Sequence, residues 1–141
     1  MTTLLAFLCL HLATADPTDL DRMAGTWQVV SGEADGMPFA GGRVGPERAV
    51  IQGDKLTFSG GGKTYPTVTL KLDPTRKPCH MDMVRATDTL SCLYELAEGS
   101  LKLAMPLTPR DRKPGEALPR PASFETKDKP VMVLLLKPAK K

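Results

Sequence analysis

Apolar and polar residues alternate along several short segments of the chain, most clearly at 55–59, 67–72 and 100–105. A period of two is typical of β-strands that have one buried and one solvated face. The run Val131–Leu136 is apolar throughout, which predicts a strand that is buried on both faces. A further strand is expected to open at Trp27. The pattern therefore predicts an all-β protein.

Residue pairs that favour turns separate these segments. They are Asp35-Gly36, Gly53-Asp54, Asp73-Pro74, Thr87-Asp88 and Glu98-Gly99. The resulting spacing gives about eight short strands, which indicates an antiparallel barrel or sandwich. No linker divides the chain, so residues 16–141 are predicted to form one domain.

A short helix is expected before the first strand. Asp16 would be its N-cap, Pro17 would lie in its first turn, and Asp19 would lie near the positive end of the helix dipole. Gly25 would end the helix. The remaining proline-rich stretch, 106–121, is predicted to be a long loop.

The first fifteen residues have the features of a cleavable signal peptide. An apolar run, Leu4–Leu12, ends in Ala13-Thr14-Ala15, a small-x-small site that signal peptidase would cut before Asp16. The run is shorter than the ~20 apolar residues of a transmembrane helix. We therefore expect an exported protein, in the periplasm, at the cell surface or outside the cell. The alternative is that residues 1–15 form a buried N-terminal helix or strand.

Composition limits which side chains can fill the core and which classes of partner the chain is expected to bind. The chain of 141 residues has a formal net charge of +3 and only 5% aromatic residues, so aliphatic and Met side chains must fill most of the core. Basic residues outnumber acidic ones after Ser100, but they are scattered among prolines. Nucleic-acid binding would require clustered Lys and Arg, so a solvated surface is expected and no nucleic-acid partner.

The start of the first strand, Gly25-Thr26-Trp27, resembles the Gly-x-Trp start of lipocalins. The segments Met23–Ser31, Ile51–Lys55, Leu70–Thr75, Leu93–Leu96 and Leu101–Leu103 are similar to a paralogous family of uncharacterised lipocalin-like domains of planctomycete bacteria. The resemblance implies an up-and-down barrel in which Trp27 packs at the closed base. A basic residue of the last strand often covers that Trp in lipocalins, and here Lys137 follows the last strand. The family implies no established activity.

Two sequence features invite functional hypotheses that the residues do not favour. Ser59–Thr64 ends like a phosphate-binding loop, but alternation after Lys63 favours a glycine hairpin. The residues 79–83 carry ligands that suit Cu(I), yet Cys79, Met81 and Met83 would share one strand face as core packing, with His80 on the other.

The two cysteines of the mature chain, Cys79 and Cys92, are predicted to stay free. A turn at Thr87-Asp88 would place Cys92 opposite Met83, four residues from Cys79 along the sheet. That offset is about 13 Å, beyond the ~7 Å that a disulfide allows between Cα atoms.

These observations favour a non-enzymatic lipocalin-like β-barrel, because the mature chain has one histidine and no recognisable nucleophile motif. No cofactor and no bound metal are expected. We expect a monomer with no transmembrane segment. A small apolar ligand would be held by inward residues, namely Phe58, Leu70, Met83 and Tyr94. The alternative is a packed structural barrel whose outer face or basic C-terminal loop binds a protein or a cell-envelope polymer.

Overall fold

A computed structural model of the chain describes residues 18–39, 46–107 and 118–139. Residues 1–15, interpreted above as a signal peptide, and most of the proline-rich loop lie outside these ranges. One helix and ten strands follow each other: α2 (Asp19–Met23), β1 (Gly25–Ala34), β2 (Met37–Phe39), β3 (Arg48–Gln52), β4 (Lys55–Gly60), β5 (Lys63–Thr64), β6 (Val68–Asp73), β7 (Cys79–Val84), β8 (Thr89–Ala97), β9 (Ser100–Pro106) and β10 (Val131–Pro138).

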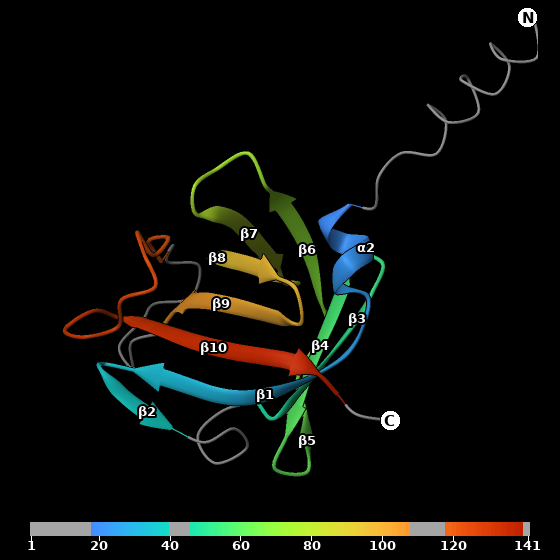
Figure 1. The fold of residues 1–141 in the computed structure, drawn as a ribbon, viewed down its shortest axis with the longest axis horizontal. Helices are drawn as coiled ribbons and strands as arrows, with labels where there is room; N and C mark the ends of the chain where they lie inside the picture. Colours follow the sequence, from blue (N-terminus) through green and yellow to red (C-terminus); the bar gives the residue numbers. More distant parts are fainter. Residues whose placement is uncertain (1–17, 40–45, 108–117, 140–141) are drawn as a thin grey trace, which may run out of the picture.

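Eight of the strands close into an antiparallel barrel, as the sequence predicted (Figure 1). Their order is β10-β9-β8-β7-β6-β4-β3-β1, and β1 pairs in turn with β10 to complete the ring. The short strands β2 and β5 lie outside the barrel, where β2 pairs with β1 and β5 pairs with β4. The chain therefore has no open sheet edge around its main core among the described strands.

The glycine turns lie where the sequence placed them. Gly53 and Gly99 have φ values of +59° and +77° and join β3 to β4 and β8 to β9. Gly61 and Gly62, with φ values of +60° and +77°, connect β4 to β5 as a two-residue hairpin. Positive φ at both positions is what such a hairpin requires, and glycine adopts it at no steric cost. The strand β5 begins at Lys63, and Gly60 pairs with Lys63, so the glycine-hairpin interpretation is confirmed.

The predicted turn between β7 and β8 was wrong by one residue. Val84 pairs with Thr89, and the backbone N–H of Arg85 donates to the carbonyl of Asp88, so the turn is at 86–87 rather than Thr87-Asp88. The Arg85 guanidinium also holds the Asp88 carboxylate through two hydrogen bonds of 2.6 and 2.5 Å. This side-chain bridge favours the turn at 86–87 over a turn at Thr87-Asp88. Residue alternation alone does not reveal the bridge.

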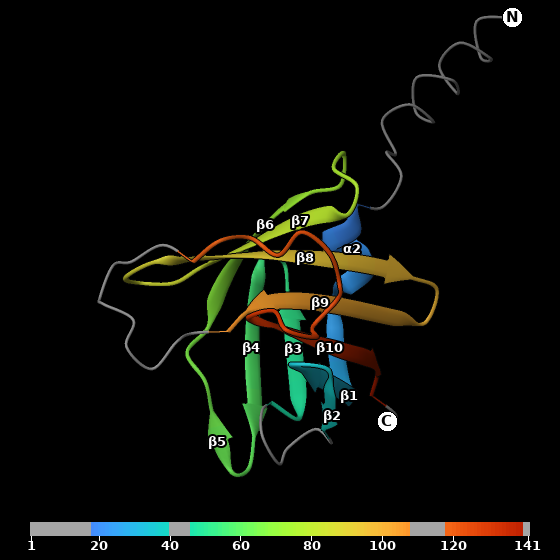
Figure 2. The same ribbon diagram turned by 90° about the vertical axis from the view of Figure 1, so that its left-hand side faces the viewer.

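The helix also begins later than the sequence indicated. Thr18, not Asp16, is the N-cap: its side chain accepts from the backbone N–H of Asp21, while the Asp21 carboxylate accepts from the N–H of Thr18. This reciprocal capping box satisfies two N–H groups at the helix start. The helix lies across one end of the barrel and leads directly into β1 (Figures 1 and 2).

Side chains that alternate along the barrel strands fill its interior. The fully buried ones include Ile51, Leu56, Met81, Leu101, Leu103, Leu134 and Leu136. A second, smaller cluster lies on the outer face of β8–β10, where Leu93, Ala104 and Val131 pack with Phe124 and Val133. This cluster explains why the sequence of β10 is apolar on both faces: one face points into the barrel and the other lies under the segment 118–130.

Candidate functional site

A cavity of about 410 Å³ lies at the end of the barrel opposite α2. Its lining comes from β4, the ends of β7 and β9, the starts of β6, β8 and β10, and the loops beside them. Ten of the twelve lining residues are apolar: Pro46, Phe58, Pro66, Val68, Met83, Leu90, Met105, Pro106, Leu107 and Met132. The volume and the apolar lining fall in the range typical of small-molecule sites, which is ~300–1,000 Å³. We call this the mouth cavity.

Two polar side chains complete the lining of the mouth cavity. Arg85 lines it from the position directly after β7, and its Nε and Nη2 both donate to the Asp88 carboxylate. Tyr65 lines it from the segment before β6, with the Lys63 ammonium 4.9 Å from the centre of its ring. A guanidinium held on two of its nitrogens keeps a fixed orientation, so the rim is preorganised.

The four residues predicted to contact a ligand fall into two groups. Phe58 and Met83 line the mouth cavity. Leu70 and Tyr94 also point into the barrel, but they lie in the packed core and are 2% and 1% exposed. The barrel is therefore hollow at the mouth and filled toward α2, a division that the sequence did not reveal.

Tyr94 belongs to the closed end, where it anchors α2. Its hydroxyl donates a 2.6 Å hydrogen bond to Oδ2 of Asp19. Burial, together with this carboxylate, raises the pKa of the Tyr94 phenol far above its usual value, since both disfavour the phenolate.

Trp27 lies at the same end. It is 5% exposed, and its indole Nε1–H donates 2.7 Å to the carbonyl of Met23, the last residue of α2. Its register partners are Ala49 on β3 and Pro138 on β10. Lys137 is exposed and pairs with Gln28, so it lies on the opposite face from Trp27 and does not cover the indole. A second hollow, of about 520 Å³, lies at this α2 end of the barrel. It is lined largely by exposed residues such as Arg22 and Glu98.

The sulfur-containing residues of β7 and β8 are part of the core. Met81 and Met83 are buried and Cys79 packs against the same cluster. With the observed register Cys92 pairs with Met81, so it is offset from Cys79 by two residues rather than the expected four. This offset still corresponds to about 8 Å between Cα atoms. Both cysteines are free.

Burial raises the pKa of the Cys92 thiol to about 12, because the thiolate would lose its solvation there. Among the described residues, no group of three or more His, Cys, Asp or Glu side chains is placed to hold a metal ion.

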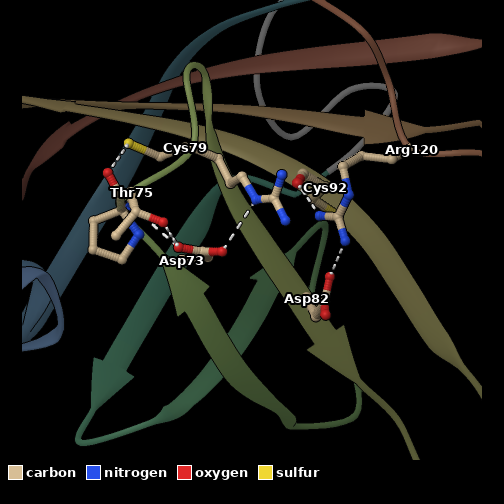
Figure 3. A network of polar contacts seen from close by, with 8 residues as sticks. Asp73, Thr75, Cys79, Asp82, Cys92 and Arg120 are labelled. Atoms are coloured by element: carbon tan, nitrogen blue, oxygen red, sulfur yellow. Dashed lines mark hydrogen bonds and ion pairs between the residues drawn. The ribbon is translucent and has the colours of Figure 1, made fainter.

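A polar network fastens the segment 118–130 to the outside of the barrel (Figure 3). Arg120 donates 2.6 Å to Oδ1 of Asp82 on β7 and 2.7 Å to the carbonyl of Cys92 on β8. Nearby, the side chain of Thr75 donates to Asp73 and lowers the pKa of that carboxyl. At the far end of the segment, the buried Thr126 hydroxyl accepts from the N–H of Gly36, 2.9 Å away.

Sequence reasoning missed most of the mouth cavity. Leu90, Met105 and Met132 are inward residues near strand ends, and strand alternation indicates their face. Their common location depends on the register of four neighbouring strands, which the sequence does not provide. Tyr65 and Pro46 lie outside the strands, and no periodicity marks them.

Comparison of the chain with family models, with curated proteins and with solved structures found no match. Within the described ranges, none of the helical structure is long and apolar enough to cross a membrane.

Proposed function

We propose that this chain is an exported, non-enzymatic barrel of the lipocalin-like kind that binds a small apolar molecule in the mouth cavity. The observation that carries the proposal is the cavity itself: about 410 Å³ of space, lined by ten apolar residues, at the end of the barrel opposite α2. The Gly25-Thr26-Trp27 start supports the lipocalin-like part of the proposal, and Ala13-Thr14-Ala15 supports export.

The strands that frame the mouth cavity give it a fixed shape. Continuous antiparallel pairing joins the six strands around the cavity, which are β4, β6, β7, β8, β9 and β10. Little conformational entropy would therefore be lost in ordering the site when a ligand binds. A ligand that removes about 200 Å² of apolar surface from water would gain about 5 kcal/mol before the entropic cost of association. Since 5 kcal/mol corresponds to a dissociation constant of about 0.2 mM, we expect constants of about 0.2 mM or weaker for simple apolar compounds.

The lining favours binding over catalysis. Its two polar side chains are Tyr65 and Arg85, and its twelve residues include no His, Cys, Ser or carboxylate that would act as a nucleophile or general base. The ligand would thus leave the cavity chemically unchanged.

The test is titration of the mature protein with N-phenyl-1-naphthylamine, an uncharged probe whose fluorescence rises in apolar surroundings. Two variants of β8 form a matched pair: Leu90 lines the mouth cavity, whereas Leu96 lies six residues away at the α2 end, and both are partly buried. We expect Leu90→Trp to weaken probe binding at least tenfold because the indole fills the cavity. Leu96→Trp should bind like the unmodified protein.

Circular dichroism and denaturant unfolding would establish that both variants fold. Absence of probe binding to the unmodified protein, or equal loss in the two folded variants, would overturn the proposal. The first result would favour the packed barrel that binds through its outer face.

A further inference from the structure

Methionines are concentrated in one wall of the mouth cavity. The chain has seven methionines, and three of them, Met83, Met105 and Met132, line this single cavity. They come from β7, β9 and β10, which together with β8 form a continuous stretch of the barrel. The thioether groups therefore form one side of the cavity rather than isolated contacts.

Aromatic rings lie on the other wall. Phe58 is on β4, and Tyr65 precedes β6, the neighbour of β4 in the barrel. The chain has only 5% aromatic residues, so two of them at one cavity is a marked local enrichment. Rings of this kind pack favourably against another ring, either offset-stacked or edge to face.

The third component is the guanidinium of Arg85, the residue directly after β7. Asp88 engages its Nε and Nη2 at 2.6 and 2.5 Å, which fixes the plane of the group while the side chain still lines the cavity. A planar guanidinium stacks on aromatic faces and is attracted by their electron density. Thioether sulfur likewise makes favourable contacts with aromatic rings.

The floor of the cavity limits the size of a ligand. Val68, Met83 and Met105 are 8%, 3% and 5% exposed. Beneath them Leu70, Met81 and Leu103 are buried in the continuous core. A long acyl chain would need a tunnel through this packed region, so the space accommodates a compact molecule.

From these observations we infer that the mouth cavity selects a compact aromatic ligand over an aliphatic one of equal carbon number. This inference rests on the proposed function and adds the chemical class of its ligand. Thioether, aromatic ring and oriented guanidinium all gain more from a π-face than from a methylene chain. A cavity that merely excluded water would instead prefer the more hydrophobic aliphatic compound.

The experiment compares 2-naphthol with 1-decanol, which have the same number of carbons and one hydroxyl each, by isothermal titration calorimetry on the mature protein. We expect 2-naphthol to bind more tightly, although 1-decanol is the more hydrophobic of the two. The triple variant Met83→Leu/Met105→Leu/Met132→Leu keeps the apolar volume and removes the sulfur. It should weaken 2-naphthol about tenfold and change 1-decanol less than twofold.

Met37→Leu is the matched control, because Met37 is on β2, is 69% exposed and lies outside the cavity. Met132→Leu alone, at a partly buried position, tests the same point if the triple variant does not fold. Arg85→Gln should also weaken 2-naphthol selectively.

Tighter binding of 1-decanol, or equal losses for both compounds in the methionine variants, would overturn the aromatic preference while leaving the mouth cavity as a binding site. Failure of both compounds to bind would instead overturn the proposed function.

Discussion

The hydrogen bond between Tyr94 and Asp19 connects the N-terminal helix to the barrel. Tyr94→Phe deletes a single oxygen atom and with it this bond. The Tyr94 ring is 1% exposed and would remain packed in the variant. The lost contact is a 2.6 Å bond to a carboxylate whose side chain is 19% exposed. Hydrogen bonds to charged groups contribute ~1.5–3 kcal/mol. Asp19 keeps its 3.1 Å contact with Arg22, which compensates part of the loss.

We therefore expect Tyr94→Phe to lower the free energy of unfolding by about 1.5–2 kcal/mol. Urea unfolding followed by circular dichroism measures this, with Tyr65→Phe as the control because the described structure gives Tyr65 a ring contact with Lys63 but places it outside the core. A double-mutant cycle with Asp19→Asn should show a coupling of about 1 kcal/mol or more. A loss below about 0.5 kcal/mol for Tyr94→Phe would refute the docking of α2 through this hydroxyl.

The same contact makes the free energy of unfolding depend on pH. The pKa of Tyr94 is raised in the folded protein, so the native state keeps its phenol proton where the unfolded chain releases it. This contribution is complete below the unfolded pKa of ~10 and is lost as the pH rises above it. Unfolding free energies measured from pH 8 to 11 should fall more steeply for the unmodified protein than for Tyr94→Phe.

Three further predictions concern other parts of the chain. Trp27→Ala removes a 5% exposed indole and its hydrogen bond to Met23, and should cost ~3–5 kcal/mol in a denaturant titration; a loss under about 1 kcal/mol would contradict its place in the core. Native thiol titration at pH 8 should label the partly exposed Cys79 well before Cys92, whose pKa is raised to about 12, and unfolding should release both; equal rates would contradict the burial of Cys92. Mass spectrometry of the protein from its native host should find a chain that begins at Asp16; retention of residues 1–15 would contradict export.

Local sequence signals were sufficient for the all-β class and for most of the strands, whereas the choice of a barrel over a sandwich came from the resemblance to lipocalins. Alternation in 67–72 and 100–105 marked β6 and β9, and the positive-φ glycines marked the hairpins between strands. These signals involve neighbouring residues only, which is why they can be detected without a structure. The double burial of β10 was also predictable, although the segment 118–130 that covers its outer face was not.

The candidate site depended on long-range geometry instead. Alternation correctly placed Phe58, Leu70, Met83 and Tyr94 on the inner face, yet depth along the barrel decides which of them can touch a ligand. The depth of a residue along the barrel follows from the strand register. The register of β7 and β8 depends in turn on the Arg85–Asp88 bridge at their hairpin. A shift of the turn by one residue moves each cross-strand partner by two, so the sequence could not distinguish the mouth from the closed end.

Chemical-shift mapping tests the binding of a ligand in the mouth cavity most directly. Methyl and amide spectra of isotope-labelled mature protein would be recorded during titration with 2-naphthol. We predict that the methyl groups of Val68, Leu90, Met105 and Met132 shift with one saturable dissociation constant, while those of Leu101 and Leu136 near α2 stay in place. Saturable shifts centred on the α2 end or on the outer face of β8–β10, with the mouth unaffected, would contradict the proposal.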